Sequence, residues 1–193
     1  MQKVLGVGIN DYNEKIKINN KHIKSYIVWR DMLKRCYDSK YHKSRPTYIG
    51  CTVCEEWLYF SKFKEWYDNN FPFWLERDGV IIDLDKDLLI EGNKIYSPDT
   101  CIFIPHKVNS FMTNKKSNSN KSGYTGVCWH KRLNKWRVQI NIFNNNKDRH
   151  VGYFANIEDA GDAYIKARAI EAEKAKGYLR ELGYDEKIIN KIK

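Results

Sequence analysis

The sharpest hydrophobic pattern in the chain lies in residues 136–142, which read Trp-Arg-Val-Gln-Ile-Asn-Ile. Apolar and polar residues alternate strictly there, and a period of two is typical of a β-strand whose two faces differ. The apolar residues would face a core, while the polar residues between them would face the opposite side. Residues 124–129 and 149–154 are predicted to pair with this strand in a three-stranded antiparallel sheet.

A helix is predicted directly after this sheet. Asn156 is a favourable N-cap, and the carboxylate of Asp159 suits the positive end of the helix dipole. Small residues then recur at helical spacing, which would let the helix lie close on the sheet. They are Ala160, Ala163 and Ala167, with Tyr164 beside them. A short closing helix is expected at residues 185–193.

The first half of the chain is predicted to be mainly helical. Helices are expected at residues 22–37 and 55–69, separated by a loop over residues 39–50. Aromatic residues recur at every third position of the second helix, a spacing that favours core packing over stacking on bases. The expected buried residues are Ile27, Met32, Leu33 and Cys36 in the first helix, and Trp57, Phe60, Phe63 and Trp66 in the second.

Two apolar strands are expected after these helices, at residues 80–84 and 101–104. Residues 113–122 contain no apolar side chain and are predicted to form a basic, polar linker. The sequence therefore predicts an α+β fold in two domains, residues 1–112 and residues 123–193.

Composition adds a preferred partner to this picture. The chain carries 34 Lys and Arg residues against 24 Asp and Glu residues, and this net charge of +10 suits a polyanion such as duplex DNA. No apolar run is long enough for a signal peptide or a membrane span, so a cytoplasmic protein with no membrane partner is expected. Five cysteines, an odd number without a secretory signal, indicate reduced thiols.

Short motifs in the second half resemble those of the AP2/ERF DNA-binding domain. In chain order they are Tyr-Thr-Gly-Val at residues 124–127, Lys-Trp at 135–136, Val-Gly-Tyr-Phe at 151–154, Glu-Asp-Ala at 158–160 and Ala-Tyr at 163–164. The resemblance implies a sheet that enters the major groove and contacts bases and phosphates from its strands. Plant members usually have Arg or Trp where this chain has Thr125 and Cys128, so their target sequence is not carried over.

The resemblance also implies which residues would face DNA. By position they are Thr125, Cys128, His130, Arg132, Arg137, Gln139, Asn141 and His150. Guanidinium and carboxamide groups are the ones that read guanine and adenine edges in a major groove. Lys131, Lys135 and Arg149 add positive charge on the expected strands and turns, which argues against a merely solvated polar face.

The middle of the chain resembles an HNH, or ββα-metal, nuclease motif. Residues 82–109 contain a strand ending in polar residues, a Gly-Asn turn, a second strand and a helix that carries Asn109. The resemblance implies that Asp85 and Asn109 would hold a divalent cation such as Mg²⁺ or Mn²⁺ while a general base activates water. The candidate metal site is therefore Asp85 with Asn109.

The general base is the weak point of this resemblance. The histidine expected beside the first ligand is absent, and Lys86 or Asp87 stands in its place. Lysine is a poor base unless its pKa is strongly depressed, and His106, one turn from Asn109, could substitute. An active endonuclease and a degenerate, structural ββα unit both fit these residues.

Further motifs within residues 4–111 resemble phage-encoded proteins of the HNH or AP2-domain endonuclease kind. They occupy residues 29–37, 46–48, 51–57, 84–87 and 92–98. This resemblance implies the cytoplasm of a bacterial host as the place of action. It indicates a source and a family more directly than a reaction.

The cysteines raise a separate question. Cys51 and Cys54 have the spacing of zinc ligands, but a closed site needs two more, and Cys36 and Cys101 are the remaining cysteines of this half. Since no second Cys-x-x-Cys exists, we expect buried thiols that behave as small apolar residues rather than a zinc site.

The sequence thus predicts a protein that binds double-stranded DNA with some sequence preference, and that cuts phosphodiester bonds if its ββα unit is active. Two alternatives stay open: a non-catalytic DNA-binding regulator, and a phage protein whose basic face binds a host factor. A module this small reads few base pairs, so a homodimer would extend the site.

Overall fold

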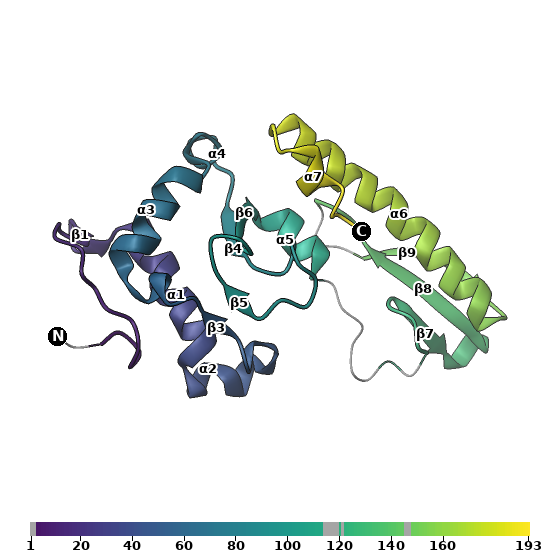
Figure 1. Cartoon of the computed structure of the whole chain (residues 1–193). Helices are drawn as coiled ribbons and strands as arrows, with labels where there is room; N and C mark the ends of the chain where they lie inside the picture. Colours follow the sequence, from purple (N-terminus) through teal and green to yellow (C-terminus); the bar gives the residue numbers. More distant parts are fainter. Residues whose placement is uncertain (1–2, 114–119, 121, 145–147) are drawn as a thin grey trace. The chain divides into compact units, whose positions relative to one another are not determined.

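The computed structural model describes residues 3–113, 120, 122–144 and 148–193 (Figure 1). The chain is mixed α and β, as predicted, and divides into two compact units, Met1–Ile104 and Pro105–Lys193. Most of the expected linker lies outside the described residues. No helix in the described part of the chain is long and apolar enough to cross a membrane.

Helices α1 (Lys24–Tyr37) and α3 (Phe60–Asn70) pack together in the first unit. Met32, Leu33 and Cys36 of α1 are buried, as predicted. The prediction that Ile27 is buried was wrong, because it is 37% exposed. Trp29 fills the core instead, and its indole Nε1 donates a hydrogen bond to the Trp57 carbonyl at 2.7 Å.

The helix expected at residues 55–69 is broken. A 3₁₀ turn, η2 (Glu56–Leu58), precedes α3, and Tyr59 between them is extended, with φ −94° and ψ 122°. The cause is a pairing that is distant in sequence: Ile9 donates to the Leu58 carbonyl at 2.8 Å and accepts from the Phe60 N–H at 2.9 Å. Core packing is confirmed for Trp57, Phe60 and Phe63, which are buried; Trp66 is only half-buried, with its ring against those of Trp57 and Phe103.

The prediction of a loop over residues 39–50 was also wrong. It contains a short helix, α2 (Ser39–Ser44), and a 3₁₀ turn, η1 (Pro46–Tyr48). Asp38 caps α2, because its Oδ1 accepts hydrogen bonds from the backbone N–H groups of Lys40 at 2.8 Å and Tyr41 at 3.2 Å.

Short strands complete the first unit. β1 (Lys17–Ile18) and β2 (Lys21–His22) form an antiparallel pair, β3 (Thr52–Val53) lies parallel to β5 (Ile95–Tyr96), and β4 (Ile82–Asp85) pairs with β6 (Ile102–Pro105). The two apolar strands expected in this region are therefore confirmed within two residues. A five-residue helix, α4 (Phe73–Arg77), precedes β4.

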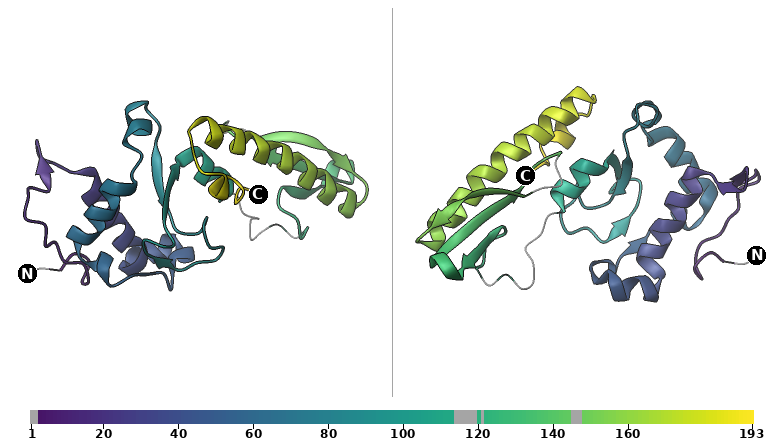
Figure 2. Two further views of the ribbon diagram at one scale, coloured as in Figure 1. Left: turned by 45° about the horizontal axis from the view of Figure 1, so that its top comes forward. Right: turned by 180° about the vertical axis from the view of Figure 1, so that it is seen from behind.

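The second unit contains the predicted three-stranded antiparallel sheet, in the order β7 (Val127–His130), β8 (Lys135–Asn141) and β9 (Asp148–Phe154). Helix α6 (Ile157–Glu181) lies along one face of it (Figures 1 and 2). The predicted N-cap is confirmed, since the Asn156 side chain accepts from the Glu158 N–H at 2.9 Å.

Two smaller helices join α6 in this unit. Helix α7 (Glu186–Ile189) closes the chain, and α5 (His106–Met112) opens the unit. Arg168 of α6 donates to the Phe111 carbonyl at 2.9 Å, and its guanidinium lies 3.4 Å from the centre of the Phe111 ring. These contacts attach α5 to α6.

Close packing between sheet and helix depends on two glycines. Gly126 has φ +69°, and a Cβ there would lie 2.3 Å from the Gln139 carbonyl oxygen. Gly161 of α6 makes room for the Tyr124 ring, which would be 2.5 Å from a Cβ at that position. The core around them consists of Val127, Val138 and Ala160, lined by Tyr124, Trp136, Val151, Phe154 and Tyr164.

Candidate nucleic-acid interface

The pairing register divides the side chains of the sheet between two faces. Val127 pairs with Val138, and Cys128 pairs with Arg137, and directly opposed residues share a face. The buried valines mark the face that α6 covers. The opposite side, here called the open face, carries Cys128, His130, Lys135, Arg137, Gln139, Asn141, Asp148, His150 and Tyr153.

A bulge in β9 decides which of its residues join the open face. Val138 pairs with Gly152 but Gln139 pairs with His150, so Val151 is an extra residue. The bulge places Arg149 opposite the buried Ile140, on the α6 side.

Arg149 has a partner on that side. Its guanidinium lies 3.8 Å from a carboxylate oxygen of Glu171, a fully buried residue of α6. The same carboxylate accepts from the Phe143 N–H at 3.1 Å and from the Lys174 ammonium at 2.8 Å. Arg149 thus belongs to the joint between sheet and helix, and sequence reasoning missed Glu171 because a glutamate at helical spacing gives no sign of burial.

Arg137 lies at the middle of the open face. Its Nη2 donates to the Cys128 sulfur at 3.4 Å, and Tyr153 lies directly across from it on β9. Its buried Nε has no hydrogen-bond partner among the described residues. The guanidinium is therefore held in place from one side and keeps unused donors.

Tyr153 is a residue of this face that sequence reasoning missed. It is 39% exposed, and its ring centre lies 5.2 Å from that of His130 and 4.6 Å from that of His150. The three rings form an aromatic row beside Arg137. The register alone reveals this row, because the bulge interrupts the alternation of β9.

The remaining candidates lie at the ends of the strands. Lys131 and Arg132 are exposed in the 3₁₀ turn η3 (Lys131–Leu133), and His130 accepts from the Leu133 N–H through Nδ1 at 3.3 Å. Thr125 is half-buried in the turn before β7. The structure thus brings the β8 candidates onto one face with Cys128, His130 and His150, and leaves Thr125 outside the strands.

The charge of the chain is concentrated in the region that contains the sheet. Residues 105–156 hold ten Lys or Arg residues and one Asp, whereas residues 157–193 hold eight residues of each sign. Residues 1–104 are nearly balanced, with 16 basic and 15 acidic residues. Almost all of the net charge of +10 therefore comes from the strand-bearing region and not from α6.

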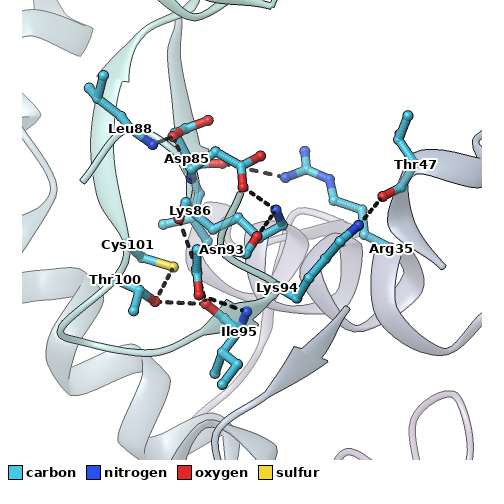
Figure 3. A network of polar contacts seen from close by, with 12 residues as sticks. Arg35, Thr47, Asp85, Lys86, Leu88, Asn93, Lys94, Ile95, Thr100 and Cys101 are labelled. Atoms are coloured by element: carbon cyan, nitrogen blue, oxygen red, sulfur yellow. Dashed lines mark hydrogen bonds and ion pairs between the residues drawn. The ribbon is translucent and has the colours of Figure 1, made fainter. Parts of the chain in front are cut away.

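The ββα candidates of the first unit make structural contacts (Figure 3). Asp85 Oδ1 accepts from the backbone N–H groups of Asp87 at 2.9 Å and Leu88 at 2.7 Å. Burial raises the pKa of Asp85, although these hydrogen bonds oppose the shift. The carboxylate therefore stabilises the turn that follows β4.

Lys86 is also engaged in this loop. Its ammonium is buried and donates to Asp87 Oδ1 at 2.5 Å and to the Asn93 carbonyl at 2.7 Å. The Asn93 amide in turn donates to the Lys86 carbonyl at 2.9 Å (Figure 3). This reciprocal pair closes the loop between β4 and β5.

The remaining two residues proposed for the ββα site, His106 and Asn109, belong to the second unit. His106 and Asn109 lie on α5, where His106 Nε2 is 3.2 Å from the Ser110 hydroxyl. Within the described ranges, no group of three or more His, Cys, Asp or Glu side chains could hold a metal ion. Asp85 is half-buried and its Oδ1 already accepts two backbone hydrogen bonds, so its carboxylate is a poor fit for a Mg²⁺ or Mn²⁺ ligand.

The cysteines of the first unit are mostly in its core. Cys36, Cys51 and Cys101 are buried, and Cys54 is half-buried. Burial raises the pKa of Cys36 to about 12 and that of Cys101 to about 12. Cys36, Cys51 and Cys101 therefore pack as small apolar residues of the core.

Comparison of the chain with protein-family models, with curated proteins and with solved structures found no match. The AP2/ERF and HNH resemblances therefore rest on short sequence motifs alone.

Proposed function

We propose that this protein binds double-stranded DNA through the open face, with β8 supplying the sequence preference. The observation that carries the proposal is the alternation of β8, whose apolar side is covered by α6 while Arg137, Gln139 and Asn141 lie on the other side. The charge excess of residues 105–156 supports the same partner.

The chemistry of this face suits a major groove. Arginine can donate two hydrogen bonds to guanine, and glutamine or asparagine can pair with adenine, each contact giving roughly 1–3 kcal/mol of discrimination. Cations at the turns, such as Lys131 and Arg132, would contact phosphates and position the strand without reading sequence.

A duplex titration tests the proposal. A preferred duplex is selected from a random pool by repeated binding, and its affinity is measured by fluorescence anisotropy beside that of an unrelated duplex. We expect Arg137→Ala and Gln139→Ala to weaken binding to the preferred duplex and to reduce the difference in affinity between the two duplexes. Lys166→Ala, which removes an exposed cation of α6, is the matched control and should change little.

The proposal fails if Arg137→Ala and Gln139→Ala bind both duplexes as the parent does. Weak binding without any sequence preference would instead favour the host-factor alternative, in which the basic face meets an acidic protein.

Binding without cleavage is the form of the proposal that the geometry favours, because Asp85 and Lys86 are engaged in the loop after β4. We expect duplex affinity to be unchanged by EDTA, and no nicking with Mg²⁺ or Mn²⁺. If the parent nicks the duplex and Asp85→Ala and Asn109→Ala do not, the endonuclease hypothesis would be supported instead.

A further inference from the structure

The charge of the first unit is balanced in total but unevenly distributed. Residues 34–50 hold five Lys or Arg residues and one Asp, while the rest of residues 1–104 hold 11 basic and 14 acidic residues. The basic segment covers the end of α1, all of α2 and η1. One part of this unit is therefore strongly positive against an acidic remainder.

This segment is a fixed surface rather than a loose loop. His42 of α2 contacts the Arg35 carbonyl of α1 through Nε2 at 2.8 Å, and the Tyr41 ring packs on the Tyr48 ring at 5.8 Å. Lys94, which precedes β5, donates to the Thr47 carbonyl at 2.8 Å and brings a further cation to the same place (Figure 3).

We call the exposed cations of this surface the basic ridge: Lys34, Lys40, Lys43, Arg45 and Lys94. Arg35 is not part of it, because its guanidinium is turned inward to the Leu84 carbonyl at 3.4 Å. Asp38, the one acidic residue of the segment, is occupied in capping α2.

Three cations of the ridge have no structural task. The side chains of Lys40, Lys43 and Arg45 make no hydrogen bond or ion pair with any described residue, and all three are exposed. Exposed cations that have no ion-pair partner among the described residues repel one another, so a polyanion that covers them is favoured.

We propose that the basic ridge is a second nucleic-acid contact that binds the phosphate backbone. The ridge offers ammonium groups and one guanidinium, without the carboxamides of β8, so it would add affinity and no sequence preference. The proposal rests on the proposed function for the choice of duplex DNA as the ligand, and it extends that function from one unit of the chain to both.

The test compares two triple variants of the full chain. Lys40→Ala/Lys43→Ala/Arg45→Ala removes three cations of the ridge. Lys15→Ala/Lys17→Ala/Lys21→Ala removes three exposed cations from the β1–β2 region of the same unit and keeps the net charge equal. Thermal unfolding of both variants, followed by circular dichroism, should match the parent, because none of the six side chains has a described partner.

Affinity for the preferred and the unrelated duplex is then measured from 50 to 300 mM salt. For the ridge variant we expect roughly a tenfold or larger loss at 0.1 M salt, equal for both duplexes, and a fall of about 1 to 3 in the slope of log K against log salt. The control variant should keep affinity within about twofold, because phosphates that are not contacted release no counterions.

The outcomes separate this inference from the proposed function. If the ridge variant keeps the parent's affinity and slope while Arg137→Ala weakens binding, the inference is overturned and the open face stands. If both triple variants lose the same amount of duplex affinity, the loss reflects net charge, and the basic ridge is not a specific binding site. If the ridge variant loses affinity while Arg137→Ala and Gln139→Ala bind both duplexes as the parent does, the open-face proposal fails and the inference holds.

Discussion

Replacing Gly126 by alanine should damage the sheet more than any ordinary loop substitution. The position has φ +69°, which costs a residue with a Cβ about 1–2 kcal/mol. A Cβ would also lie 2.3 Å from the Gln139 carbonyl oxygen and 2.4 Å from a carbon of the Tyr164 ring. The ring can turn, but the carbonyl is backbone of β8 and cannot move without moving the strand.

The clash has a further cost because it disturbs a hydrogen bond. The Gly126 carbonyl accepts from the Gln139 N–H at 2.8 Å, and separating the two segments would weaken that bond, worth about 1 kcal/mol. Overpacking of this kind costs about 1–3 kcal/mol. Together we expect a loss of roughly 3–6 kcal/mol in the free energy of unfolding of the second unit.

Gly123→Ala is the matched control. Gly123 has φ +88°, but a Cβ there would meet nothing within 4 Å, so only the backbone cost of about 1–2 kcal/mol applies. Urea unfolding measures the loss, and hydrogen exchange of peptides from β7 to β9 shows that it belongs to the second unit. Equal losses in the two variants would refute the steric argument.

Glu171, two buried thiols and the half-buried Asp11 each give a further prediction. Glu171→Ala should cost about 1–3 kcal/mol in urea unfolding, because it leaves the Phe143 N–H without its buried acceptor, while the half-exposed Arg149 and Lys174 can turn to water; Glu171→Gln, which keeps an acceptor, should cost less. Cys36 and Cys101, whose pKa values near 12 keep them protonated, should resist iodoacetamide at pH 8 until urea unfolds the protein, as read by mass spectrometry; early labelling would contradict their burial. For Asp11, burial alone would raise the pKa, but hydrogen bonds from Ser61 prevail and lower it, so its stabilising effect is complete above the unfolded value near 3.8 and is lost as pH falls through the lower folded pKa. In Asp11→Asn, the free energy of unfolding should therefore depend less on pH below about pH 4. If its pH dependence in that range equals that of the parent, Asp11 does not contribute in this way.

Predictions from sequence succeeded where neighbouring residues decide the structure. The alternation of β8, the capping of α6 by Asn156 and the burial of Met32 and Leu33 all depend on side chains within a few positions of one another. They failed where a distant segment intervenes. Ile9 extends the backbone at Tyr59 and breaks the expected helix.

The candidate site shows the same division. The polar side of β8, with Arg137, Gln139 and Asn141, can be predicted from the sequence alone, because a strand's period of two does not depend on a partner. The rest of the face depends on how the strands pair. The bulge at Val151 turned Arg149 toward Glu171 and set Tyr153 across from Arg137, since register is a property of two paired strands and one extra residue exchanges the faces.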